Sequence, residues 1–241
     1  MKNKGENLKM RQTEKFIVLD TETAGGLEFP LAYDLGLVVM DRTGRVYEER
    51  SLVIYNIYSK RDLMESAYYA EKLPSYEEQL KNGCRKMVRL YTAKKLIAEL
   101  MEKYHITTVY AYNMGFDKRA LNNTEKFTTK SKYKEFFPEN TEFRCIWNMA
   151  CQVLLARKSY IKFALDNGYY SEKGNIFTTA ECCYRYITNN LNFIEEHQGI
   201  DDVRIEAEIL LKCFKQHKKM DTRPNSGCWQ RVQTKRKELG M

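Results

Sequence analysis

The chain has 241 residues, 43% of them hydrophobic, which suits one domain with a substantial core, with or without a tail. No apolar run reaches the roughly 18 residues of a membrane-spanning helix, and the start of the chain lacks the apolar stretch of a secretory signal. We therefore expect a cytoplasmic protein that does not enter a membrane, and its net charge of +8 is compatible with a polyanionic partner without requiring one.

The first predicted elements are strands that follow a polar lead-in over residues 1–14. Apolar and β-branched residues predict strands over 15–23, 33–41 and 45–54. The last two are joined by the turn DRTG, with glycine at its end, which is typical of a hairpin. Three strands in such close succession indicate an antiparallel meander.

Helices and one further strand occupy the middle of the chain. A helix is expected over 60–72, with a break at Pro74. Apolar residues at helical spacing predict an amphipathic helix over 92–104, followed by a strand over 107–112 and a helix that begins in the segment GFDKRAL. A strand, a long helix and another strand in this order indicate a βα crossover.

The last third of the chain is predicted to be mostly helical. A short strand is expected at 143–147, and helices are expected at 148–157, 178–188 and 201–217. From Met220 onward turn residues and charges replace any regular period, which indicates an irregular segment. We therefore expect a lead-in over 1–14, one domain over 15–218 and a basic C-terminal tail over 219–241.

Much of the positive charge lies at the C-terminus. From Lys212 onward there are nine basic side chains and two acidic ones, a net charge of +7. Such a segment attracts a polyanion and strengthens its binding through counterion release. The alternative is a solvated tail without a partner, and composition does not separate the two.

The cysteines show no metal-binding pattern. There are seven, an odd number, and no C-x-x-C pair, which argues against a zinc ribbon. We expect reduced and mostly buried thiols.

Two acids end the first predicted strand. In FIVLDTETAGG, Asp20 and Glu22 are two positions apart, so their side chains share one face of the strand. Like charges this close cost stability unless a cation lies between them, and carboxylates are the natural ligands of Mg²⁺ and Mn²⁺. Surface strands often carry such pairs, so the motif alone is weak.

Two later stretches add acids and a histidine. Asp117 follows the strand over 107–112 at a helix start, where an acid could equally serve as a first-turn acid stabilised by the helix dipole. In EEHQGIDDVRIEAEIL, His197 precedes a helix and Asp202 lies in its first turn. Asp202 neighbours the apolar stripe that we predict on this helix, formed by Val203, Ala207, Leu210 and Phe214. A capped helix start with a surface histidine is the alternative there.

The three stretches in this order resemble one family. Strand-D-x-E, then N-x-x-F-D after a βα crossover, then H-x-x-x-x-D opening a late helix, resemble the DEDDh exonucleases, which include the epsilon proofreading subunit of bacterial DNA polymerase III. The resemblance spans about residues 16–210. The stretch GYYSEKGNIFTTAECCYRYI is also similar to phage and prophage members. The family implies an RNase H-like α/β fold, with a mixed sheet of about five strands flanked by helices.

The resemblance also implies the roles of single residues. The metal ligands would be Asp20, Glu22, Asp117 and Asp202, which together hold two divalent ions, Mg²⁺ or Mn²⁺. His197 would be the general base. Thr23 would lie near the terminal nucleotide, and Asn113 would be a supporting residue beside Asp117.

The implied function is 3′–5′ exonucleolytic hydrolysis at a single-stranded or frayed DNA 3′ end, releasing nucleoside monophosphates. The partner could include a DNA polymerase in trans, as in proofreading. Two alternatives stay open: an exoribonuclease of the same fold, and a non-catalytic module that binds nucleic acid or a polymerase.

The sequence departs from the family pattern at two positions. Gly199 replaces a frequent alanine two places after the histidine, and we expect the freer backbone there to let His197 move. Tyr112 replaces the histidine that often precedes the asparagine of the second motif. Asp201 and Glu206 are the neighbours most easily confused with Asp202.

Overall fold

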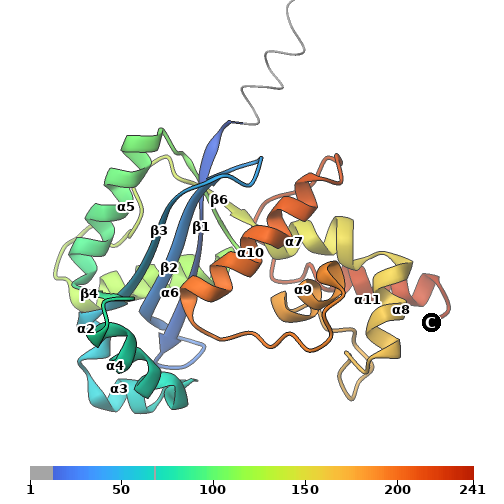
Figure 1. The fold of residues 1–241 in the computed structure, drawn as a ribbon, viewed down its shortest axis with the longest axis horizontal. Helices are drawn as coiled ribbons and strands as arrows, with labels where there is room; N and C mark the ends of the chain where they lie inside the picture. Colours follow the sequence, from blue (N-terminus) through green and yellow to red (C-terminus); the bar gives the residue numbers. More distant parts are fainter. Residues whose placement is uncertain (1–12, 68) are drawn as a thin grey trace, which may run out of the picture.

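A mixed sheet of six strands forms the centre of the molecule (Figure 1). The computed structural model describes residues 13–67 and 69–241, so most of the expected lead-in lies outside the described residues. The strand order is β4-β3-β2-β1-β5-β6. The strands are β1 (Lys15–Ala24), β2 (Leu31–Asp41), β3 (Val46–Ile54), β4 (Lys86–Val88), β5 (Thr108–Ala111) and β6 (Glu142–Cys145).

The predicted meander and crossover are confirmed. Strand β2 pairs antiparallel with both β1 and β3, whereas β5 pairs parallel with β1 and β6. The hairpin turn closes through the Gly44 N–H, which donates to the Asp41 carbonyl at 3.1 Å. The expected count of about five strands misses β4, a strand of three residues that pairs parallel with β3.

Helices from the first half of the chain cover one face of the sheet. They are α2 (Tyr55–Tyr58), α3 (Arg61–Glu65), a 3₁₀ turn (Ala70–Lys72), α4 (Leu73–Lys81), α5 (Leu90–Tyr104) and α6 (Met114–Thr128). The helical region predicted over 60–72 is present as two short pieces, α3 and the 3₁₀ turn, but the predicted break at Pro74 is wrong. The chain leaves the helix after Glu65, and Pro74 lies in the first turn of α4, where its missing N–H costs no hydrogen bond.

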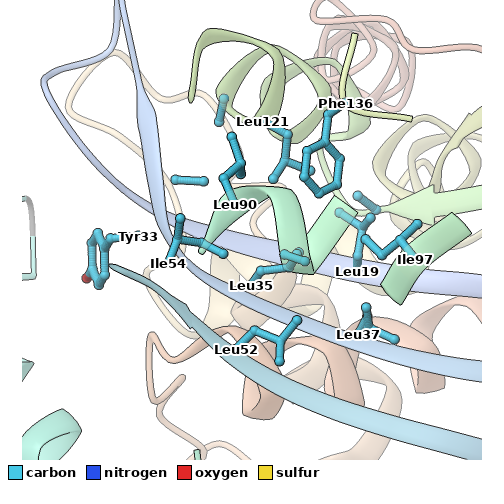
Figure 2. Close-up of a cluster of buried hydrophobic side chains, with 14 of the residues drawn as sticks. Leu19, Tyr33, Leu35, Leu37, Leu52, Ile54, Leu90, Ile97, Leu121 and Phe136 are labelled. Carbon is cyan, nitrogen blue, oxygen red and sulfur yellow. The ribbon is translucent and has the colours of Figure 1, made fainter. Parts of the chain in front are cut away.

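The core on this face joins the sheet to α5 and α6. Leucines at alternate positions of β1 and β2 point to the same side because side chains alternate along a strand. Figure 2 shows them meeting Ile97 of α5, Leu121 of α6 and Phe136, all of them fully buried. The sheet residues in this cluster include Leu19, Leu35, Leu37, Leu52 and Ile54.

The second half of the chain covers the other face. Its elements are α7 (Ile146–Ala150), a π-helical turn (Cys151–Leu155), α8 (Lys158–Asp166), α9 (Ala180–Thr188) and α10 (Gly199–Phe214). The apolar stripe predicted for α10 is confirmed, because Val203 and Leu210 are fully buried against the sheet cluster that contains Val18. Both faces of β2 are therefore covered, which explains why every one of its residues is buried.

The C-terminal segment is folded, and the prediction of an irregular segment there is wrong. Helix α11 (Gln230–Glu238) packs near α8 and the π-helical turn, with Val232 fully buried. Before it, the Thr222 carbonyl accepts the Cys145 N–H at 2.7 Å, and Asn148 Nδ2 donates to the Arg223 carbonyl at 3.0 Å. The helix has little apolar pattern of its own, so its packing depends on a few side chains that the sequence does not single out.

The cysteines are reduced and mostly buried, as predicted. All seven cysteines are free thiols and only Cys84 is exposed. Across residues 13–67 and 69–241, no helix is both long and apolar enough to cross a bilayer.

Candidate active site

Strand β1 delivers two of the acids at the end of the sheet. Asp20 pairs with Gly36 of β2, and Glu22 pairs with Asp34, so both acids lie on the face that α10 covers. A register shift follows directly between Glu22 and Thr23, where the strand leaves its regular pairing. The strand therefore ends with two carboxylates on one side, as the D-x-E spacing predicts.

Helix α6 brings the third acid to the same strand. Asp117 is 3% exposed, and its Oδ1 accepts the Thr21 backbone N–H at 3.2 Å and the Thr21 hydroxyl at 2.9 Å. The N-cap of α6 is Asn113, so Asp117 does not cap the helix. Its carboxylate instead ties α6 to β1 beside Asp20, whose pKa it helps to raise.

Helix α10 brings the fourth acid, and the segment just before it brings the histidine. One ligand atom each of Glu22, His197 and Asp202 lie within 4.8 Å of one another, as a metal site requires. Asp202 is 4% exposed, and its buried Oδ1 has no hydrogen-bond partner. Asp201 points elsewhere, because its Oδ1 pairs with Arg204 at 3.0 Å.

Burial and mutual repulsion hold protons on these acids in the metal-free protein. Burial, then the nearby Asp202, raises the pKa of Glu22 to about 9. Burial also raises the pKa of Asp202 to about 8 and that of Asp117 to about 7. The pKa of Asp20 is raised well above its ordinary value, first by burial and then by Glu206. Such a cluster favours any divalent cation that replaces the protons.

His197 is fixed by its backbone and by a ring stack. Its φ of 51° lies in the left-handed region, which is uncommon for a residue other than glycine. Its imidazole stacks on Tyr69 with ring centroids 4.0 Å apart and planes 11° from parallel. Burial lowers the pKa of His197 below its ordinary value, so the imidazole is neutral at neutral pH and able to accept a proton.

A buried ion pair anchors the segment that follows His197. Arg85 Nη1 donates to both oxygens of Asp34 at 2.7 Å, and Arg85 Nη2 donates to Gln198 Oε1 at 2.8 Å. Asp34 also accepts the Gly199 N–H at 2.9 Å and the Tyr76 hydroxyl at 2.7 Å. The two backbone residues after His197 are thereby held to β2.

Gly199 does not loosen His197, contrary to our expectation. A Cβ on Gly36 would lie 2.1 Å from the Gly199 carbonyl carbon, and a Cβ on Gly199 would lie 2.8 Å from the Gly36 nitrogen. The two glycines let the start of α10 touch β2 directly. The glycine at position 199 therefore serves close backbone contact, which keeps Asp202 near Asp20.

The remaining predicted residues lie around the acids. Asn113 is exposed, in a hollow of about 340 Å³ between the start of α6 and the turn over 224–226. Thr23 is half-buried just past the register shift of β1. Tyr112 is buried; its N–H donates to Glu206 Oε2 at 3.0 Å and its hydroxyl donates to the Thr178 carbonyl at 2.8 Å.

Sequence reasoning treated Glu206 only as a residue that could be mistaken for Asp202, and it missed other members of this site. Glu206 is 3% exposed and lies one helical turn after Asp202, where it raises the pKa of Asp20. Burial raises the pKa of Glu195 to about 7, and Glu195 in turn raises that of Asp202. Asp34 could have been noticed as a lone charge inside the apolar strand YDLGLVV. Nothing in the sequence marks Arg85 or Tyr69.

Solved structures with the same fold include exonucleases. A 3′-exonuclease solved for its specific recognition of the histone mRNA stem-loop has a TM-score of 0.55 at 8% identity, and the match covers 87% of this chain and 85% of that one. Exonuclease I of E. coli with single-stranded DNA and zinc gives 0.53 at 12% identity. With a dA16 oligonucleotide it gives 0.54 at 14% identity.

The match to exonuclease I is partial. It covers 85% and 83% of this chain, and this chain spans about two fifths of the exonuclease I chain, 41% in both structures. No family model matches the sequence, and no curated protein does. At these identities the comparison establishes the fold. The predicted RNase H-like exonuclease fold is confirmed.

Proposed function

We propose that this protein is a metal-dependent 3′–5′ exonuclease that hydrolyses DNA from the 3′ end and releases nucleoside monophosphates. The observation that carries the proposal is the meeting of Glu22, His197 and Asp202 within 4.8 Å, beside Asp20 and Asp117. Three elements distant in sequence bring these groups to one end of the sheet. A core would not gather so many acids without a cation.

The residues fit two divalent ions, Mg²⁺ or Mn²⁺. Asp20, Glu22, Asp117 and Asp202 supply only carboxylate oxygens, the donors that these hard cations prefer. The unpartnered Oδ1 of Asp202 supports this assignment, because a buried carboxylate oxygen otherwise needs a donor. When bound, the ions supply positive charge that stabilises the attacking and leaving oxygens of a phosphodiester displacement.

His197 would act as the general base. Water attacks phosphorus, the bond from phosphorus to the 3′ oxygen of the preceding nucleotide breaks, and the imidazole accepts the proton that the water loses. The Tyr69 stack and the hydrogen bonds of Gln198 and Gly199 hold the ring in place during this step. The freed 3′ oxygen takes a proton and becomes the new 3′ end.

The test uses a 5′-labelled single-stranded DNA in Mg²⁺, Mn²⁺ and EDTA. We expect shortening from the 3′ end with either metal and none in EDTA. Asp202→Asn and His197→Ala should each slow it by about 100-fold or more, whereas Asp201→Asn, a neighbour paired with Arg204, should leave the rate near that of the wild type. Full activity of Asp202→Asn would refute the proposed site.

RNA is the second candidate substrate. The solved 3′-exonuclease that recognises the histone mRNA stem-loop matches this chain over most of both lengths, so the assay also needs an RNA substrate. A matched RNA in the same assay separates the candidates by rate, since a 2′-hydroxyl preference reports the substrate. Binding in Ca²⁺ with no turnover in Mg²⁺ or Mn²⁺ would identify a non-catalytic module instead.

Proofreading beside a polymerase is a narrower form of the proposal. It predicts faster removal of a mismatched 3′ nucleotide from a primed template than of a matched one. Equal rates on matched and mismatched 3′ ends would refute the proofreading role but would not contradict the exonuclease activity.

A further inference from the structure

A second concentration of positive charge lies away from the C-terminus. Residues 86–95 contain four basic side chains and no acid, and residues 126–134 (KFTTKSKYK) contain four lysines and no acid. The two segments are far apart in sequence, so their meeting in space is a property of the fold.

The two segments line one groove between the start of α5 and the end of α6. This α5–α6 groove has a volume of about 620 Å³, and Arg89, Lys94 and Lys95 line it from the first segment. Thr128, Thr129 and Ser131 line it from the second. Among the described residues that line it, Glu125 is the single acid, and Lys94 pairs with it at 3.1 Å.

Exposed aromatic rings lie along the α5–α6 groove. Tyr91, which lines it, is 76% exposed. Through Asn56 and Thr128 the groove joins a second hollow of about 330 Å³, lined by Tyr55 and Phe127, each 46% exposed. Several large exposed rings in one place are an informative feature of a surface. Aromatic rings interleaved with basic side chains are the kind of surface on which unpaired bases stack.

We infer that the α5–α6 groove binds the single-stranded part of the substrate that precedes its 3′ end. The inference rests on the proposed function for which end of the strand reaches the acids. Helix α6 connects the two places, because Asp117 lies in its first turn and Thr128 is its last residue. The eleven residue steps from Asp117 to Thr128 span about 16 Å at the rise of an α-helix, a distance that a few nucleotides bridge.

The chemistry favours a single strand. Phosphates meet the basic side chains and the threonine and serine hydroxyls, and unpaired bases meet Tyr91, Tyr55 and Phe127. A duplex would hide its base faces from these rings. The groove is also separate from the basic helix α11, which lies on the opposite side of the molecule, beside α8 (Figure 1).

The test measures binding of the full chain in EDTA, so that no strand is cut. A 5′-labelled 20-mer of DNA and a matched RNA are titrated at 50 and 200 mM salt, with the double variant Arg89→Glu/Lys95→Glu. The control is Lys158→Glu/Lys162→Glu on α8, which makes the same change of charge. Lys158 lies at a helix start, as Arg89 does, and Lys162 belongs to an exposed i,i+4 ion pair, as Lys95 does. Thermal unfolding of both variants checks the fold.

We expect the groove variant to bind the 20-mer at least ten-fold more weakly than the control at 50 mM salt. The slope of log K against the logarithm of the salt concentration should be shallower by about 1 to 2. Each lost phosphate contact to a single strand removes about 0.7 from this slope. Tyr91→Phe should bind as the wild type does, and Tyr91→Ala should lose about five-fold. Equal binding by the groove variant and the control would overturn the inference.

A length comparison separates this inference from the proposed function. In Mn²⁺, the rate on a 20-mer relative to that on a 4-mer should fall about ten-fold in the groove variant, because only the longer strand reaches the groove. If the wild type cuts neither strand yet the groove variant loses binding, the groove stands and the exonuclease proposal falls. If cutting is normal and the length ratio unchanged, the groove inference falls alone.

Discussion

At the scale of single residues, the buried acids of the site destabilise the metal-free protein when they ionise. Glu22, Asp117, Asp202 and Glu206 are all buried or nearly so, and all have raised pKa values. Each charge that forms there costs free energy, because the one buried cation that the described residues place near these acids, Arg85, is already paired with Asp34. Activity and metal-free stability therefore depend on the same side chains in opposite directions.

Asp202→Asn should stabilise the metal-free protein as the pH rises. The native pKa of Asp202 is about 8 against an ordinary 3.8, so the native state binds a proton that the unfolded state releases between those values. Its contribution to the free energy of unfolding is complete below about pH 4 and is lost as the pH rises through 8. Between pH 5 and pH 8, the free energy of unfolding of the variant should therefore fall by at least about 1 kcal/mol less than that of the wild type.

Thermal unfolding in EDTA at pH 5, 7 and 8 provides the measurement. Asp201→Asn is the control, since its carboxylate is half-exposed and paired with Arg204. Parallel pH curves for wild type and Asp202→Asn would contradict the assignment of a buried, proton-holding carboxyl. Excess Mg²⁺ should reverse the trend in the wild type alone, because metal binding to deprotonated ligands strengthens with pH.

The sequence predicted the acids but not their supports. Strand alternation places Asp20 and Glu22 on one face without any tertiary information, and a helix start places Asp117. Glu206 acts through its contact with the backbone of Tyr112, just after β5, and Arg85 acts through its contact with Asp34 of β2. Such contacts join residues more than 50 positions apart, and no local period reports them.

At the scale of elements, the contact between α10 and β2 decides the geometry of the site. Gly199→Ala should destabilise the protein by about 1–3 kcal/mol, because its Cβ would lie 2.8 Å from the Gly36 nitrogen and force the backbones apart. The family that the sequence resembles often has alanine here. In this chain the shift would move Asp202 and His197 away from Asp20, so turnover should fall more than substrate binding.

Urea unfolding and kcat against KM for Gly199→Ala provide the measurement. Gly227→Ala is the control, because a Cβ there meets its nearest neighbour at an ordinary 3.5 Å. A Gly199→Ala protein with unchanged kcat and unchanged stability would show that α10 does not need this contact.

The long elements with a strong period were predicted, but α8 was missed although its buried Tyr160, Ile161 and Ala164 lie at helical spacing. The meander, α5 and α10 combine length with clear alternation or helical spacing. β4 has three residues, and its place in the sheet depends on pairing with β3. The helix predicted over 148–157 is two pieces, α7 and a π-helical turn, a difference of backbone hydrogen bonding that sequence periodicity does not resolve.

At the scale of the whole molecule, positive charge is concentrated in two places, and only the C-terminal one also supplies residues to the core. The α5–α6 groove is a surface, and its exposed cations are not needed for packing. The C-terminal segment combines charge with core residues, since Val232 and Cys228 are buried and Gln233 bonds to both backbone polar groups of Ile176. Removing the segment would therefore test stability before it tested nucleic-acid binding.

Truncation after Met220 and neutralisation of charge should give different results. Truncation removes the carbonyls that bind Cys145 and Asn148 and exposes apolar core, so we expect the free energy of unfolding to fall by several kcal/mol, about 3 or more. Arg231→Gln/Lys237→Gln keeps the buried face of α11 intact and should leave the melting temperature within about 2 °C.

DNA binding by the full chain with these two substitutions then reports what the charges do. If α11 steers the strand, affinity at low salt falls while affinity at high salt is unchanged, because exposed charges act over about one Debye length, roughly 10 Å at 0.1 M. If affinity is unchanged at both salt concentrations, the basic residues of α11 have no part in binding. The strand would then meet the protein through the acids and the α5–α6 groove, and the C-terminal segment would serve the fold.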